Sequence, residues 1–151
     1  MEQADIGYLL NKVTRQFRLK LGEALSETGL TPPQAAVLMA IARSGAGRLT
    51  PRSIAEAIDT DAATTSGLLD RLTRDGWLDA VQNPDDGRSR LIGLTAKTNA
   101  ALPGVMAAAD AVSARATAHL TAAESETVSR LLAKLCETEE IPATKRKAGS
   151  R

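Results

Sequence analysis

The sequence is poor in the residues that build disulfides, metal centres and stacking surfaces. Its 151 residues include one cysteine, Cys136, and one histidine, His119. An internal disulfide, a cysteine metal cluster and a three-histidine zinc site are therefore excluded. The three aromatic residues, Tyr8, Phe17 and Trp77, are too few for a surface that stacks on single-stranded nucleic acid. Cys136 falls in an apolar helical pattern, so we interpret it as a small core residue in a reducing compartment.

The sequence also lacks long apolar runs, a strong net charge and common enzyme motifs. No run reaches the roughly 18 apolar residues of a membrane span, and the acidic start lacks the basic segment of a signal peptide. We therefore expect a cytoplasmic protein with no membrane partner. The formal net charge of +1 gives no globally basic surface, so binding to nucleic acid must depend on where the charges lie. Without a glycine-rich phosphate loop or a nucleophile with a histidine partner, we expect no enzymatic activity, no metal and no cofactor.

Apolar spacing and capping residues predict a mainly α-helical fold with one small β-hairpin. In residues 6–26, apolar side chains recur every three or four positions and so share one helix face. Capping residues mark the starts of five more helices, at Thr31, Thr50, Asp61, Thr95 and Thr121. Pro103 is expected to kink or break the long helix that runs to about residue 120.

Apolar stripes on the first, fifth and last helices exceed what one small lobe covers. They comprise residues from Ile6 to Leu25, then Val105, Met106, Ala109, Val112, Ala116 and Leu120, and finally Val128, Leu131, Leu132 and Leu135. A second copy of the chain is the expected cover, because a symmetric dimer buries the same patch on both subunits.

Residues 53–74 form a predicted helix-turn-helix, and its second helix is the candidate DNA reader. The first turns of that helix carry Thr64, Thr65 and Ser66. Their short hydroxyl side chains suit base edges, and the free amides of the helix N-terminus suit a phosphate. Arg71 and Arg74 lie one to two turns further on and are predicted to hold the flanking DNA backbone. The alternative is that the hydroxyl residues only solvate a surface helix.

A basic hairpin follows directly after the helix-turn-helix. Its turn is predicted at residues 83–87, between strands at 77–81 and 88–94. Arg88 and Arg90 are two residues apart and so share one strand face. Asp86 is placed to orient the Arg88 guanidinium through a bidentate pair, which prepares Arg88 for the minor groove. The alternative is an ion pair that only stabilises the turn. This order of elements is the outline of a winged-helix DNA reader.

A series of short motifs is also present along about residues 6–137. It comprises Leu30-Thr31-Pro32-Pro33-Gln34, Val37-Leu38, Ile54-Ala55, Leu69-Asp70-Arg71-Leu72, Asp75-Gly76-Trp77-Leu78, Asp85-Asp86-Gly87-Arg88 and Leu94-Thr95. No single motif is decisive, but the ordered set resembles the MarR family of bacterial transcription regulators. The resemblance implies a homodimer whose first and last helices interlock, with two winged-helix lobes on a pseudo-palindromic operator. Many members of that family respond to small phenolic or lipophilic effectors.

The resemblance also assigns roles to residues. The base-facing stretch comprises Ala63, Thr64, Thr65, Ser66 and Gly67. Asp86 and Arg88 match the wing motif, and Arg52 and Ser53 lie where the third helix meets the DNA backbone. We expect one domain, residues 1–151. Its parts are a winged-helix lobe at about 31–97, dimerisation helices at about 5–28 and 95–138, and a disordered basic tail at 139–151.

The predicted function is therefore sequence-specific binding of double-stranded DNA by a homodimeric repressor that a small effector releases. Bound to DNA, it would be associated with the nucleoid. Two features support the alternative of a winged-helix module that binds protein and not DNA. Gly67 stands where many relatives carry a longer polar or basic side chain, and residues 61–97 hold five basic and six acidic side chains. Thr98 also departs from the family, because a glycine usually follows the wing.

The sequence also offers residues for an effector site. A pocket between the lobe and the dimerisation helices would place Arg15, Arg18 and His119 as partners for an anionic effector. The alternative for each is a solvated helix face.

Overall fold

The structure is a computed structural model that describes residues 5–137. They fall into two compact units, one ending at Arg115 and the other starting at Ala116. The helices are α1 (Ile6–Ala24), α2 (Pro32–Arg43), α3 (Pro51–Ala57), α4 (Ala62–Arg74), α5 (Ala96–Ala116) and α6 (Ala122–Cys136), with a 3₁₀ turn, η1, at Ser26–Thr28. The strands are β1 (Arg48–Leu49), β2 (Leu78–Asn83) and β3 (Asp86–Leu94). The basic tail predicted at 139–151 lies outside the described residues.

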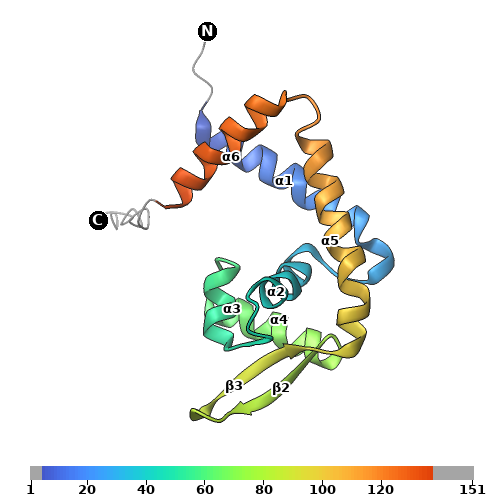
Figure 1. The fold of residues 1–151 in the computed structure, drawn as a ribbon, viewed down its shortest axis with the longest axis vertical. Coiled ribbons are helices and arrows are strands. Elements are labelled where there is room, and N and C mark those ends of the chain that lie inside the picture. Colours follow the sequence, from blue (N-terminus) through green and yellow to red (C-terminus); the bar gives the residue numbers. More distant parts are fainter. Residues whose placement is uncertain (1–4, 138–151) are drawn as a thin grey trace, which may run out of the picture. The chain divides into compact units, whose positions relative to one another are not determined.

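The predicted fold class is confirmed: a mainly helical chain with a small antiparallel sheet. In Figure 1, α2, α3 and α4 gather into one cluster, and the hairpin of β2 and β3 extends away from them. The first helix is shorter than predicted, because α1 ends at Ala24 and η1 follows before Gly29. Gly29 has a left-handed φ of 72°, which glycine adopts without steric cost and which turns the chain toward α2.

Polar caps start the helices where the sequence predicts them. Thr31 and Gln34 form a reciprocal capping box at α2, and Thr121 and Glu124 form a second one at α6. The Thr50 hydroxyl caps α3. Hydrogen bonds from the backbone N–H and the hydroxyl of Thr121 lower the pKa of Glu124, because they favour its charged form.

The sheet has three strands in the order β1-β3-β2, all antiparallel. The hairpin of β2 and β3 was predicted, whereas β1 was not. Arg48 and Leu49 of β1 pair with Gly93 and Ile92 of β3. A strand of two residues is too short to show the alternation from which strands are predicted. Strand β1 pairs with the edge of β3 that β2 does not use. This pairing connects the base of the hairpin to the segment before α3.

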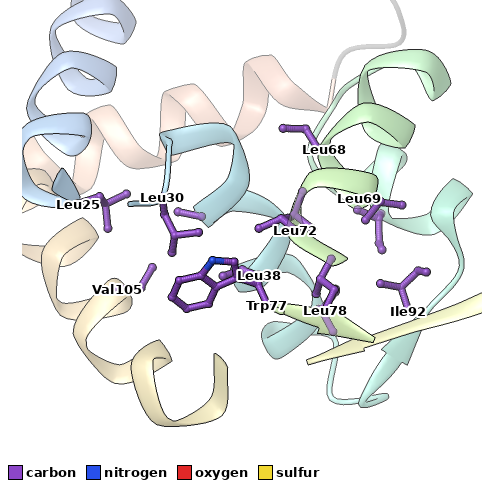
Figure 2. Close-up of a cluster of buried hydrophobic side chains, with 14 of the residues drawn as sticks. Leu25, Leu30, Leu38, Leu68, Leu69, Leu72, Trp77, Leu78, Ile92 and Val105 are labelled. Atoms are coloured by element: carbon purple, nitrogen blue, oxygen red, sulfur yellow. The ribbon is translucent and has the colours of Figure 1, made fainter. Parts of the chain in front are cut away.

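One hydrophobic core fills the first unit. Leu38, Ile41, Ile54 and Leu72 are almost fully buried, and Trp77 packs with them where α4 meets the sheet. Figure 2 shows the labelled side chains converging from α2, α4, α5, the sheet and the segments before α2 and β2. Burying such side chains stabilises the fold by about 1.5–3 kcal/mol each. This core fixes α4 and the hairpin relative to each other.

The same core takes up part of the stripes predicted to need a second subunit. Leu21 of α1, Leu25 directly after that helix, and Val105 and Ala109 of α5 belong to it. Val112 is also buried in the single chain. For these residues the expectation of a partner is wrong, because the winged-helix lobe extends over both helices. The unit that ends at Arg115 is therefore larger than the lobe predicted at 31–97.

Helix α5 runs through Pro103 without a break and ends at Ala116, before the predicted residue 120. Its start is anchored to the lobe by two hydroxyl groups. The Thr95 hydroxyl donates to the Gly76 carbonyl oxygen at 2.8 Å, and the buried Thr98 hydroxyl donates to the Trp77 carbonyl oxygen. Thr98, which departs from the family pattern, therefore satisfies a carbonyl group at the end of the α4–β2 turn.

In the second unit, α6 presents its apolar side chains to solvent. Val128, Leu131, Leu132 and Leu135 are between 40% and 55% exposed. Cys136 is exposed as well, so its interpretation as a core residue is wrong. The helical spacing correctly placed it near the apolar stripe, but that stripe is uncovered. Among residues 5–137, no helix is long and apolar enough to cross a membrane.

Candidate nucleic-acid interface

The outward face of α4 is the centre of the candidate interface. Leu68, Leu69 and Leu72 are buried, so at 3.6 residues per turn the opposite stripe faces outward. That stripe consists of Ala63, Ser66, Gly67, Asp70 and Arg74, which are exposed or half-buried. Its first half has only small side chains, and these allow the helix backbone to come close to base edges.

Thr65 is not on the outward stripe, and its predicted contact with bases is wrong. Its side chain is 1% exposed, because it precedes Leu68 by three residues and Leu69 by four and so shares their inward face. Its Oγ1 atom has no hydrogen-bond partner among the described residues. The chemical type of Thr65 suggested a surface residue, but the helical period decides its direction.

The N-terminus of α4 carries its own anion. Asp61 Oδ1 accepts a hydrogen bond from the Thr64 N–H at 2.8 Å, and Oδ2 accepts one from the Thr64 hydroxyl at 2.7 Å. The backbone bond, followed by the hydroxyl bond, lowers the pKa of Asp61, so the carboxylate is charged at neutral pH. The phosphate site predicted at this helix end is therefore already occupied by a carboxylate, and Thr64 uses its hydroxyl proton within the protein.

The two arginines of α4 differ in their placement. Arg71 folds back along the helix, and its Nε donates to the Gly67 carbonyl oxygen at 3.0 Å. Arg74 lies on the outward stripe in the last turn of the helix and is exposed. Both guanidinium groups are accessible, so α4 presents two positive charges C-terminal to its small-residue stretch.

Helix α3 contributes Arg52 and Ser53. The Arg52 Nε donates to Glu56 Oε1 at 3.0 Å, but the two side chains are 90% and 65% exposed. Such an exposed ion pair is weak and is readily exchanged for a phosphate. The Ser53 hydroxyl lies 3.0 Å from the Thr50 hydroxyl within the α3 cap and is half-buried. Of the two residues, Arg52 is the one free to contact DNA backbone.

A groove gathers predicted residues from three elements. It has a volume of about 1120 Å³ and is lined by α3, α4 and the base of the hairpin. Arg52, Ser66, Arg74 and Arg90 all contribute to its lining, although up to 38 residues separate them in sequence. The fold thus brings together three of the predicted cationic side chains around one concave surface beside the outward face of α4. The same groove is also lined by the acidic residues Glu56, Asp59, Asp61 and Asp70.

The wing presents both of its arginines, but not through the predicted ion pair. Asp86 Oδ1 accepts a hydrogen bond from the backbone N–H of Arg88 at 3.0 Å. In the described part of the chain, no ion pair joins Asp86 to the Arg88 guanidinium. The bidentate prediction is therefore wrong: Asp86 bends the backbone at the tip, and the guanidinium groups of Arg88 and Arg90 remain exposed.

A polar frame that the sequence did not reveal shapes the wing tip. Asn83 accepts from the Asp85 N–H at 3.0 Å and donates to the Ser89 hydroxyl oxygen at 2.9 Å. Gln82 Nε2 donates to the Gly87 carbonyl oxygen at 3.0 Å. The strand register shifts between Gln82 and Asn83, where these bonds replace regular pairing. The turn-forming residues signalled a turn, but not which side chains close it.

The predicted effector residues fall into different units. Arg15 and Arg18 line a groove of about 440 Å³, together with Pro32 and Pro33 at the start of α2. His119 lies in the second unit, between α5 and α6, and is exposed. Among residues 5–137, no cluster of three or more histidine, cysteine, aspartate or glutamate side chains has the arrangement of a metal site.

Comparison with known proteins gives a consistent result. A family model described as MarR family matches residues 28–89. The multiple antibiotic resistance protein MarR of Escherichia coli is 32% identical over 94 residues, or 62% of this chain and 64% of that protein. An HTH-type transcriptional repressor of Mycobacterium tuberculosis is 30% identical over 134 residues, or 89% of this chain and 95% of the repressor.

Among solved structures, a mutant of E. coli MarR complexed with operator DNA matches this fold with a TM-score of 0.80. The two are 29% identical, and the match covers 86% of this chain and 92% of that one. The sequence match to E. coli MarR itself spans 64% of the length of that relative, a little under two thirds.

Proposed function

This chain belongs to the MarR family, and we propose that it binds a double-stranded DNA operator and represses transcription from it. The observation that carries the proposal is the groove beside α4, with Arg52, Arg74 and Arg90 on its walls. A relative of the same fold that was solved in complex with operator DNA supports DNA binding as the function. We further infer that the chain is a regulator and not an enzyme, since two of its relatives are named as an HTH-type transcriptional repressor and an HTH-type transcriptional regulator.

In the proposed complex, α4 enters the major groove and the hairpin reaches the neighbouring backbone or minor groove. The small outward residues Ala63, Ser66 and Gly67 let α4 approach base edges. Arg52 contacts phosphates from α3, and Arg74 contacts them from the end of α4. At the wing tip, Arg88 reaches into the minor groove, where the negative potential attracts a guanidinium group.

A homodimer is part of this proposal. The first half of α1 is exposed along its apolar side, with Ile6, Leu9 and Val13 between 44% and 65% exposed. The apolar side chains of α6 are exposed to a similar degree. Two copies that cover these faces would present two lobes about one DNA turn apart, roughly 34–36 Å. The operator would then be a pseudo-palindrome.

We also propose that a small anionic or phenolic effector binds at the groove of Arg15 and Arg18 and weakens DNA binding. The two guanidinium groups supply positive charge, and Pro32 and Pro33 supply apolar wall. A hydroxybenzoate is a suitable probe. It should lower the affinity for the operator in the native protein and have less effect on Arg15→Ala and Arg18→Ala, while an uncharged analogue should act weakly. Equal responses in all three proteins would remove this site.

The competing function is a winged-helix module that binds another protein through the same surface. The near-neutral charge of residues 61–97 favours it. The two functions differ in their response to salt, because DNA binding releases counterions and falls steeply with salt, whereas docking through apolar surface does not.

Selection from random duplexes tests the main proposal without knowledge of the operator. Several rounds of binding to the full chain, followed by sequencing, should enrich an inverted repeat whose half-sites are about one helical turn apart. Pools that stay random, with retention no better than on non-specific DNA, would move the protein-binding module to first place.

A further inference from the structure

The guanidinium group of Arg71 lies nearer the centre of the outward stripe of α4 than the backbone of Arg71 does. On α4 it lies at the flank of the outward stripe, whereas Gly67 lies near the centre of that stripe. A long helical side chain leans toward the preceding turn, and Arg71 does so here. Its Nε donates to the Gly67 carbonyl oxygen at 3.0 Å.

Because Gly67 has no side chain, the space beside it is open to the Arg71 guanidinium. A Cβ atom built on Gly67 would lie 3.6 Å from Arg71 Nη2 and has no other neighbour within 4 Å. A longer side chain at position 67 would extend into the same space as the guanidinium. The helix thus shows a positive charge at the centre of its outward face, although the residue at that position has no side chain.

The free edge of this guanidinium has the right chemistry for one particular base. With Nε bound to the helix carbonyl, Nη1 and Nη2 keep four N–H donors in one plane. In the described part of the chain, no carboxylate pairs with Arg71. Two parallel donors match the O6 and N7 acceptors of guanine in the major groove. The bond at Nε also holds the fork in place, so less side-chain freedom is lost on binding.

We propose that Arg71 reads a guanine in each operator half-site through Nη1 and Nη2, and that Gly67 makes this possible. The inference rests on the proposed DNA-binding function and deepens it. It replaces the expected contact of Arg71 with the flanking backbone by a contact with a base. Arg74 makes no comparable contact with the helix backbone among the described residues, so it keeps the role of a phosphate contact and serves as the matched control.

The test compares base preferences, because a phosphate contact and a base contact both affect affinity. Selection from random duplexes would be run with the native chain, Arg71→Ala, Arg71→Lys and Arg74→Ala. The native chain should enrich one guanine per half-site, and replacing it by adenine or 7-deazaguanine should weaken binding about tenfold or more. Arg71→Ala should lose this preference, and Arg71→Lys should weaken it, because lysine lacks the planar fork that holds two parallel donors in place. Arg74→Ala should bind all duplexes more weakly but keep it.

Position 67 provides a second test with its own control. Gly67→Leu fills the space of the guanidinium and should lose the guanine preference, while Gly67→Ala adds only a contact of ordinary length and should keep it. Both changes raise helix propensity, so α4 should fold in each, as thermal melting would verify. If Gly67→Leu kept the guanine preference, the open space at Gly67 would not be needed for the contact between Arg71 and guanine.

The outcomes separate this inference from the proposed function. If the native chain enriches no sequence, the DNA-binding function fails and the inference fails with it. If it enriches an operator, and Arg71→Ala weakens binding to every duplex by the same factor with its base preferences unchanged, only the inference is overturned. Arg71 would then be a backbone contact.

Discussion

At the scale of single residues, Asp61 has two opposed effects on the proposed function. Its carboxylate caps α4 through two hydrogen bonds from Thr64 and interacts favourably with the positive end of the helix dipole. The same charge stands at the end of the helix that approaches a polyanion. Asp61 therefore stabilises the reading helix and weakens its attraction to DNA.

Asp61→Asn should separate these two effects. Asparagine caps helices about as well as aspartate, so α4 should remain folded. DNA binding should become tighter by a few-fold, because one negative charge beside the phosphates is removed. Fluorescence anisotropy on the selected operator measures this, with Asp110→Asn on α5 as a control for net charge. An equal gain in both variants would show that the position of Asp61 is unimportant.

The same residue predicts a pH dependence of stability. Hydrogen bonds from Thr64 lower the pKa of Asp61 in the folded chain. The stabilisation from the charged cap is therefore complete above the ordinary aspartate pKa, and it is lost as the pH falls through the lower folded value. Thermal melts from neutral to acidic pH should show a larger loss for the native chain than for Asp61→Asn. Parallel curves for the two proteins would contradict the assigned cap.

Individual side chains were predictable where local rules decide their position. The caps at Thr31, Thr50 and Thr121 follow from the residue type and the next three residues. The polarity of Thr65 predicts a surface position, but the helical period set by Leu68 and Leu69 turns its side chain inward. The contact between Arg71 and Gly67 was not predictable, since several rotamers of a long side chain fit the same helix.

At the scale of elements, the base of the hairpin depends on Arg48 of β1. Its Nη1 donates to Asp79 Oδ1 of β2 at 2.5 Å and to the Leu91 carbonyl oxygen at 3.4 Å. The Arg48 side chain passes directly over Gly93 of β3. One arginine thus joins all three strands and fixes the direction in which the wing leaves the lobe.

Gly93→Ala should disturb this junction. The new Cβ would lie 2.9 Å from Arg48 Cζ and 3.0 Å from Cγ, so the arginine must move and its bond to Asp79 is strained or lost. We expect the free energy of unfolding to fall by about 1 kcal/mol. Gly104→Ala in α5 is the control, because its Cβ meets nothing within 4 Å, and it should stabilise by about 0.5–1 kcal/mol. Urea unfolding measures both, and shifts in the same direction would argue against the junction.

Elements with a clear period or a clear turn were predictable, and short or tertiary ones were not. Helix α4 and the hairpin follow from apolar spacing and the turn residues after Gln82. Strand β1 forms because Arg48 and Leu49 pair with the free edge of β3. No local pattern in these two residues predicts that pairing. Helix α5 continues through Pro103, although proline removes a backbone donor there, so the local rule for a break did not hold.

At the scale of the whole molecule, the helices outside the lobe have two kinds of apolar surface. The end of α1 reaches the core through Leu21, and Leu25 directly after the helix is also buried there. The first half of α1 and the apolar side of α6 are exposed. Such exposed faces are typical of interaction surfaces, and a second copy of the chain is the proposed partner. The sequence does not show which apolar residues of these stripes pack against the lobe. The buried and exposed parts could therefore not be told apart from the sequence.

The double variant Leu9→Glu/Val13→Glu should separate the dimer into monomers. Both side chains are exposed in the single chain, at 44% and 57%, so the substitutions should not disturb its core. Sedimentation or light scattering would give the mass, and Trp77 fluorescence would verify folding. Asn11→Glu, on the opposite side of α1, should remain dimeric. A dimer that persists in the double variant would exclude the first half of α1 from the interface.

The most direct test of the central claim is a salt titration of DNA binding. Fluorescence anisotropy with the selected operator would compare the native chain, Arg88→Ala and Arg43→Ala, an exposed arginine at the end of α2. We predict saturable binding that falls steeply with salt, a loss of about tenfold or more in Arg88→Ala with the dimer intact, and near-native binding in Arg43→Ala. Binding that is no tighter than to random duplexes, or that is insensitive to salt, would contradict a DNA-binding repressor.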